Sequence, residues 1–288
     1  MKKNILILAI LSLTPFIANA WTNCGKINGQ DSNCEYQVSS DGVLTIRPVD
    51  SNQDAIMPTY SHSSEVTVNS SYRTTAPWYD ERHDITSLQI EDGIQNISKD
   101  AFMEMRWLKS VDMADSVISI GSDAFTNAIS LTDVNLSKNL KTISSGAFQR
   151  AVSLKEVSLP EGLNLVHSGL FNYTNNITSL SIPDSLIDSK DFNIAALERS
   201  NIQTLYCSKE KETACDNYIK RAKEAGYAPQ NLSYQLYEKY GSGYVYGGKF
   251  YANSGDVGTT KYIQKRIYTI DEANKVTGPV NRVSIRYR

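Results

Sequence analysis

The sequence predicts an α/β solenoid of 23-residue coils, with an N-terminal β cap and a small C-terminal α+β module. The first observation is that Phe102, Phe125, Phe148 and Phe171 stand 23 residues apart in a chain with only seven Phe. The second is that seven columns of apolar residues share this period. A unit of this size cannot bury its apolar side chains alone, so neighbouring units must stack. The third is a pair of cysteines at each end of the repeats.

The N-terminus predicts a secretory signal peptide over residues 1–20. Lys2 and Lys3 precede an apolar run at 5–17, and Ala-Asn-Ala at 18–20 offers the small residues that signal peptidase accepts. The run is shorter than the roughly 20 residues that span a bilayer, and no comparable stretch follows, so we expect no transmembrane segment. We expect a secreted or cell-surface protein, with a periplasmic location left open.

The four cysteines are Cys24, Cys34, Cys207 and Cys215. An oxidising compartment allows two disulfides with three possible connectivities. Proximity favours Cys24 with Cys34 and Cys207 with Cys215. The alternative is a metal site, which is disfavoured because the pairs lack the tight Cys-x2–4-Cys spacing of zinc ribbons.

Each repeat unit is expected to contain one strand and one return segment. Leu88 and Ile90 are apolar and alternate with polar neighbours, which predicts a strand with these two side chains inward. Parallel strands then stack along the solenoid axis. The Ile-x-x-x-Ala-Phe stretch at 97–102 is expected to return the chain on the opposite side as a short helix or turn, with its Phe inside the coil.

One unit, residues 108–125, reads Leu-Lys-Ser-Val-Asp-Met-Ala-Asp-Ser-Val-Ile-Ser-Ile-Gly-Ser-Asp-Ala-Phe. This unit resembles the BspA-type leucine-rich repeat family, whose units read Leu-x-x-Leu-x-Leu-x-x-x-Leu-x-x-Ile-Gly-x-x-Ala-Phe. Segments 41–46 and 76–94 look like that family's N-terminal cap, so the resemblance covers about residues 24–207. The resemblance implies a surface-exposed or released bacterial binding protein, often linked with adhesion to host matrix proteins or to other cells.

We divide the mature chain into four parts. Residues 21–84 are expected to form the N-terminal cap with a polar insertion, and residues 85–207 the repeats. Residues 208–240 are expected to be a helical C-terminal cap. Residues 241–288 are expected to form a Tyr-rich hairpin and a basic strand-helix-strand module.

Turn and capping residues place the elements at the two ends. Asp41-Gly42 predicts a hairpin over 35–47. Thr213-Ala-Cys-Asp216 predicts a helix start, and Gly226 its end. A second capping box at 269–272 predicts the helix of the last module.

Composition excludes several functions. The net charge of −2 and the pI near 6.0 give no broad basic field, so we expect no nucleic-acid partner. Three histidines are few for acid–base or metal chemistry, and we interpret His62, His83 and His167 as surface residues. No Walker loop, His-x-x-x-His or complete Gly-x-Gly-x-x-Gly occurs. We therefore expect no enzyme, no cofactor and no metal.

Charge is divided unequally along the chain. Residues 241–288 carry 8 basic and 3 acidic groups, a net charge of +5, whereas residues 21–240 carry 19 and 28, a net charge of −9. One interpretation is a solvated basic edge that docks on the acidic solenoid. The other is an attachment module for an anionic envelope polymer or exported partner, through Arg282, Arg286 and Arg288.

The outward strand positions are the candidate partner-binding site. They are polar and mildly acidic, with Gln89, Asp112, Asn135, Ser158 and Ser181 in one column and Asp133 and Glu156 in a second. Solenoids bind partners on such faces. The alternative is that these residues only keep the face hydrated, because the columns lack the Trp, Tyr and Arg anchors of binding hot spots. Binding there is expected to be weak or multivalent.

The sequence leaves three functions open. The first is protein recognition of the adhesion type through the strand face, with a host matrix or cell-surface protein as partner. The second is a structural envelope component in which the repeats are a spacer and the basic C-terminal module is the attachment point. The third, an exported enzyme with an unrecognised site, has no motif in its favour.

Overall fold

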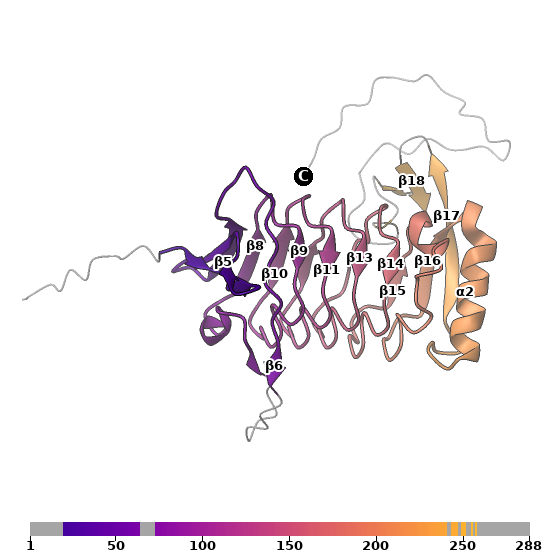
Figure 1. Cartoon of the computed structure of the whole chain (residues 1–288). Helices are drawn as coiled ribbons and strands as arrows, with labels where there is room; N and C mark the ends of the chain where they lie inside the picture. The colour runs from indigo at the N-terminus through magenta and orange to yellow at the C-terminus, as the bar shows by residue number, and fades with distance from the viewer. Residues whose placement is uncertain are drawn as a thin grey trace, which may run out of the picture.

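The computed structural model describes residues 20–63, 73–240, 243–246 and 249–251, together with residues 255 and 257. Figure 1 shows an elongated solenoid whose coils follow one another from the indigo N-terminal end to the orange C-terminal end. Helix α2 (Glu212–Glu224) closes the C-terminal end. The predicted signal peptide and the predicted basic strand-helix-strand module lie outside the described residues.

One parallel strand from successive units forms the strand face, by which we mean the outward side of these strands. β8 (Ser87–Ile90), β10 (Ser110–Met113) and β12 (Asp133–Asn135) pair in parallel. Val111 lies opposite Leu88 on one side and Val134 on the other. Partners are thus 23 residues apart, because one period returns the chain to the same position on the next rung. Inward residues are buried, which confirms the predicted alternation.

The return segments form a second parallel sheet on the opposite side. Its strands are β9 (Asn96–Ile97), β11 (Ser119–Ile120), β13 (Thr142–Ile143) and β14 (Leu165–Val166). In these units the return segment is a short strand followed by turns, so the prediction of turns holds and that of a short helix does not. Each of these coils has two residues with positive φ, four positions apart, and these residues prevent a right-handed helix. They are Asp100, Asp123, Gly146 and Gly169, and then Glu104, Asn127, Arg150 and Tyr173.

A column of aromatic rings runs through the centre of the solenoid. Ring centroids are 5.3 Å apart from Phe102 to Phe125, 5.3 Å from Phe125 to Phe148 and 6.1 Å from Phe148 to Phe171. All four side chains are fully buried. Trp78 continues the column at the N-terminal end, 5.4 Å from Phe102. The aligned rings confirm the predicted stacking of 23-residue units.

The N-terminal end of the strand face is closed by an antiparallel hairpin. β4 (Cys34–Val38) pairs with β5 (Val43–Pro48), and β5 pairs in parallel with β8. Gly42 takes the turn with a φ of 82°, in the left-handed region that suits glycine. The smaller elements here are β1 (Thr22–Asn23), β2 (Lys26–Ile27), β3 (Gln30–Asp31), β6 (His62–Ser63), β7 (Arg73–Thr74) and η1 (Tyr79–Glu81).

Both disulfides favoured by proximity are present. Cys24 is bonded to Cys34, which ties the N-terminal segment to the start of β4. Cys207 is bonded to Cys215, which ties the last repeat strand to α2. All four sulfurs are buried against the main core.

The C-terminal end is more than a helical cap. After α2, which ends before Gly226 (φ 76°) as predicted, the chain forms strand β17 (Ser233–Tyr240) parallel to β16 (Thr204–Ser208). Residues 208–240, expected to be a helical cap, thus contain strand β17 as well as helix α2. Tyr234 and Leu236 pack on the main core while Tyr237 faces the other side, which is strand alternation. The other elements are β15 (Ser179–Ser181), α1 (Asp184–Ile187), η2 (Lys209–Lys211), β18 (Gly243–Tyr246) and β19 (Lys249–Tyr251).

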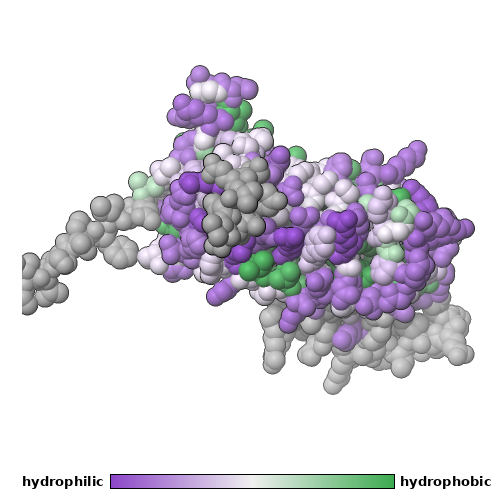
Figure 2. Space-filling model, turned by 90° about the horizontal axis from the view of Figure 1, so that it is seen from below, coloured by the Kyte–Doolittle hydropathy of each residue, from purple (hydrophilic) through white to green (hydrophobic). Residues whose placement is uncertain are grey.

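Turns join the two sides of the solenoid along two edges. The lower edge in Figure 1 holds the turns that lead into the strands, and the upper edge holds those that follow them. Figure 2 views the molecule from below and shows a mostly hydrophilic surface with a small hydrophobic patch near its centre. Both edges flank the strand face, so a partner on that face lies within reach of either edge.

Candidate recognition surface

The N-terminal part of the strand face is open to solvent. Gln89, Asp112 and Asn135 are exposed on three successive rungs, as their outward positions predict. The Asn135 side-chain amide donates a hydrogen bond of 2.6 Å to an Asp112 carboxylate oxygen. On the neighbouring column, the Ser87 and Ser110 hydroxyls are 2.9 Å apart. These cross-rung hydrogen bonds orient the polar groups before any partner arrives.

The ladder is interrupted at the next rung. The sheet that contains β8 and β10 ends at β12, and the next sheet begins at β15. The intervening segment, which includes Ser158, is not a strand, so the predicted continuous five-rung ladder is wrong there. Val157 and Leu159 stay buried, which keeps the coil in the core. Pro160 ends this rung and has no N–H for a ladder hydrogen bond.

The C-terminal part of the strand face is covered by the chain itself. Tyr237, Tyr251 and Val257 form a second buried cluster with Tyr206, separate from the main core. Because Tyr206 and Tyr237 point away from the main core, the residues that cover them lie on the strand face. Ser181 is only 1% exposed there. The prediction that Ser181 is available to a partner is therefore wrong.

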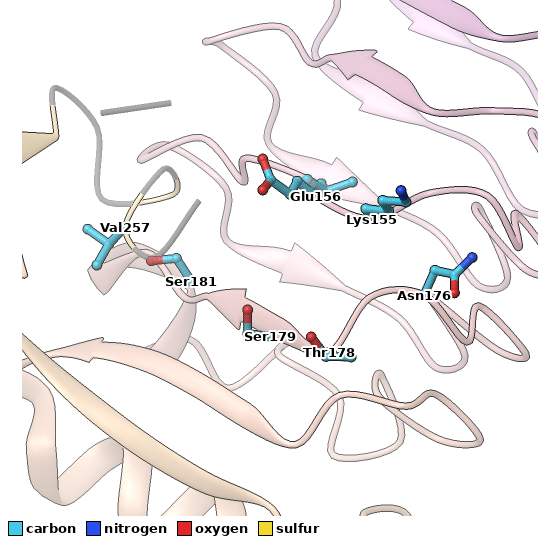
Figure 3. Close-up of a pocket in the computed structure, with 8 residues that line it drawn as sticks. Lys155, Glu156, Asn176, Thr178, Ser179, Ser181 and Val257 are labelled. Carbon is cyan, nitrogen blue, oxygen red and sulfur yellow. The ribbon is translucent and has the colours of Figure 1, made fainter. Parts of the chain in front are cut away.

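A hollow of about 340 Å³ marks the boundary between the open and covered parts. Lys155 and Glu156 line it from the interrupted rung, and Ser179 and Ser181 from β15. Figure 3 shows Val257 beside Ser181 at the covered end of the hollow. The hollow brings together the Lys155 cation, the Glu156 carboxylate and the Ser179 hydroxyl, which suits a polar group of a partner.

The structure brings together some predicted site residues and separates others. Asp112, Asp133, Asn135 and Gln89 share one continuous exposed surface. Glu156 belongs to the hollow, one rung farther along. The sequence analysis did not predict that Tyr206 and Tyr237 would be covered by Tyr251 and Val257. The Tyr-rich composition after residue 233 is a signal that apolar surface there needs burial.

Gly255→Leu is expected to uncover the C-terminal part of the strand face. Gly255 lies directly on the Leu159 backbone, and a Cβ at Gly255 would overlap the Leu159 carbonyl oxygen. The larger side chain therefore forces the covering segment away from β15 and β17, and amide hydrogen exchange in these strands should rise. Gly162→Leu is the control, because its nearest neighbour is the flexible end of Lys141. Equal exchange in β15 and β17 for both variants would show that Gly255 does not hold the cover in place.

The histidines lie at the surface, as expected, but two of them have partners. The His62 ring nitrogen Nδ1 lies 2.9 Å from a carboxylate oxygen of Asp100, which is buried. The His83 ring lies against Trp107 with centroids 4.3 Å apart. Burial raises the pKa of the neighbouring Asp123 carboxyl, and the charge of Asp100 raises this pKa further. Asp100 and Asp123 occupy left-handed turn positions, so we assign them to the turns and not to catalysis.

Stacked coils with one parallel strand each, a buried ring column and polar outward strand positions define a leucine-rich-repeat solenoid. A family model described as "BspA type Leucine rich repeat region" matches residues 78–208 in six copies. Residues 78–208 therefore match the repeat region of this family. The matched model begins at Trp78 and extends through β16, and it describes a repeat architecture and not a catalytic domain.

Solved bacterial leucine-rich repeat proteins are similar to parts of this chain. A leucine-rich repeat protein from Eubacterium ventriosum is 20% identical over 62% of this chain and 43% of its own, with a TM-score of 0.46. A leucine rich cell surface protein from Faecalibacterium prausnitzii is 18% identical over 79% of this chain and 58% of its own, with a TM-score of 0.41. This chain thus spans less than half of the first protein, and these likenesses carry no functional argument.

No curated protein matches the chain. Within the described residues, no helix combines the length and apolar character needed to cross a membrane. In the same part of the chain, no three His, Cys, Asp or Glu side chains are grouped so that they could hold a metal ion.

Proposed function

We propose that the chain is an exported bacterial recognition protein that binds a protein partner through the open part of its strand face. The observation that carries this proposal is that each of the strands β8, β10 and β12 has an apolar inward side and a polar outward side. Their apolar side chains face the core, whereas their outward side chains are polar and bonded across rungs. A flat, pre-oriented polar surface of this kind suits a protein surface better than a small molecule.

Export is supported by covalent chemistry. Two buried disulfides join residues of the mature chain, and such bonds form and persist in oxidising compartments. The predicted signal peptide at the N-terminus agrees with this. We propose a secreted or cell-surface location, with adhesion to host matrix proteins or other cells as the role.

Charge reversal on the strand face tests the proposal. Asp112→Lys combined with Asp133→Lys is expected to weaken binding to an immobilised extracellular-matrix protein by about tenfold or more. The two lysines replace oriented carboxylates with positive charges at the centre of the proposed interface. Binding of the full mature chain to a panel of such proteins is measured by biolayer interferometry. Asp92→Lys with Asp191→Lys is the control, since both residues are exposed on the upper edge. If both double variants bind like the original chain, the strand face is not the site.

The charge division along the chain favours a second candidate. In a structural envelope component, the basic segment 241–288 would be the contact point through Arg282, Arg286 and Arg288, and the repeats would act as a spacer. These arginines lie outside the described residues, so the attachment role rests on the sequence alone. Pull-down from envelope extracts with the mature chain and with residues 21–240 distinguishes the candidates, since only attachment requires the C-terminal segment.

A further inference from the structure

The lower edge of the solenoid carries a surface that the strand columns do not include. We define the basic edge as the five turns that lead into the strands, residues 104–109, 127–132, 150–155, 173–178 and 199–203. These turns belong to consecutive coils, so they lie side by side along the lower edge in Figure 1. Figure 2 shows this edge from below, where hydrophobic atoms lie among hydrophilic ones.

Charge distinguishes this edge from the opposite one. The five turns contain five cations and one carboxylate, a net charge of +4. The carboxylate, Glu104, is buried and accepts hydrogen bonds from the Asn127 amide and from Arg106 Nε, so it does not face solvent. The turns of the upper edge contain seven carboxylates and three cations, a net charge of −4; they are residues 91–96, 114–119, 137–142, 160–165 and 183–191.

Exposed apolar side chains form a stripe along the basic edge. Trp107 is 41% exposed, Ile129 37%, Val152 36% and Tyr173 40%, with one on each of four consecutive turns. Rungs about 4.8 Å apart give this stripe a length of roughly 15 Å. Among the described residues of the upper-edge turns, only Ile118 is a comparably exposed large apolar side chain. The basic edge therefore combines a net positive charge with a row of apolar side chains on consecutive coils, whereas the five upper-edge turns have a net negative charge and one such side chain.

The Tyr173 side chain of the basic edge is held in place before binding. Arg150 and Arg199 lie over the Tyr173 ring, with their Cζ atoms 5.5 and 5.7 Å from its centroid. Arg199 Nη1 donates a 3.1 Å hydrogen bond to the Tyr173 hydroxyl, and its Nε lies 3.3 Å from Glu198. Trp, Tyr and Arg dominate binding hot spots, and side chains already ordered lose less entropy when a partner binds.

We propose that the basic edge is a second interaction surface, which binds an acidic polypeptide segment carrying apolar side chains. Lys109, Arg150 and Lys155 are exposed and have no ion pair within the described part of the chain, so their charges are available to a partner. Ile129 and Val152 lie on the same series of turns and are partly exposed, so they can make apolar contacts with a peptide that a polyanion such as a sulfated glycan does not supply. The basic edge adjoins the strand face at the hollow, which Lys155 also lines. The proposal does not depend on partner binding to the open strands β8, β10 and β12.

Designed probes test the chemistry with the full mature chain. The probe is a fluorescent 12-residue peptide in which Glu alternates with Leu and Trp. Its counterpart replaces Leu and Trp by Ser, and two further probes are a heparin oligosaccharide and oligodeoxythymidylate. We expect the first peptide to bind about tenfold more tightly than its Ser counterpart, with affinity that falls as salt screens the charges. If heparin or oligodeoxythymidylate binds as tightly as the first peptide, the edge recognises polyanions in general and the proposal is wrong.

Matched variants locate the binding. Lys109→Glu with Arg150→Glu is expected to weaken peptide binding by about tenfold or more, and Ile129→Ser with Val152→Ser similarly. The controls are Lys141→Glu with Lys190→Glu, and Ile118→Ser, which make the same chemical changes on the upper edge. Circular dichroism checks that every variant is folded. Equal losses in the edge variants and the controls would overturn the assignment to this edge.

Discussion

Phe125→Ala is expected to lower the free energy of unfolding of the repeat region by about 3–5 kcal/mol. Phe125 is fully buried, and its ring stacks between Phe102 and Phe148 with centroids 5.3 Å away on both sides. Truncation removes the contacts with both neighbouring coils and leaves a cavity that stacked coils cannot close without changing their spacing.

Urea unfolding followed by circular dichroism measures this effect, and amide hydrogen exchange in β11 and β13 locates it. Phe125→Leu keeps most of the apolar volume and should cost much less. Ile118→Ala, at a 44% exposed position, should stay within about 0.5 kcal/mol of the original chain. If Phe125→Ala unfolds at the same urea concentration as Ile118→Ala, the ring column does not hold the coils together.

Trp78→Ala is expected to cost a similar amount, about 3–5 kcal/mol, with the loss concentrated at the N-terminal end. Trp78 is fully buried, stacks on Phe102 and is contacted edge-on by Tyr36 and Tyr60. Its indole N–H donates a 2.8 Å hydrogen bond to the Ala101 carbonyl oxygen. One side chain thus joins the N-terminal cap to the first coil.

Trp78→Phe separates the two contributions of this residue. The ring contact is largely kept, while the Ala101 carbonyl loses its donor, so a loss of about 1 kcal/mol is expected. Hydrogen exchange in β4, β5 and β8 is the local readout, and exchange in β16 should stay unchanged because solenoid repeats interact mainly with their neighbours. Faster exchange in β16 equal to that in β5 would contradict a local cap role.

The repeat core could be predicted because its cause is local and periodic. Phe102 and Phe125 are aligned by a 23-residue step, and Val111 pairs with Leu88 and Val134, each one period away. The same local reasoning missed strand β17 within residues 208–240, which were expected to form a helical cap, because β17 is stabilised by pairing with β16 across the α2 crossover. Pairing of that kind depends on segments distant in sequence.

The candidate surfaces were predicted less completely than the core. Gln89, Asp112 and Asn135 could be placed outward because strand alternation is local. The basic edge was missed because Tyr173 and Arg199 are 26 residues apart and share no column, although they are hydrogen-bonded in the folded chain. A comparison of residues 23 positions apart reveals only contacts that repeat at that step.

By itself, the sequence determined the stacked coils, the ring column and the side of each strand that faces solvent. These depend on side-chain alternation and on a constant step, which any stretch of the repeat carries within it. Only the tertiary structure decided that Ser181 is covered by Tyr251 and Val257, and that opposite charges collect on the two edges. The physical reason is that burial and electrostatic fields arise from segments that the fold brings together and that the order of residues leaves far apart.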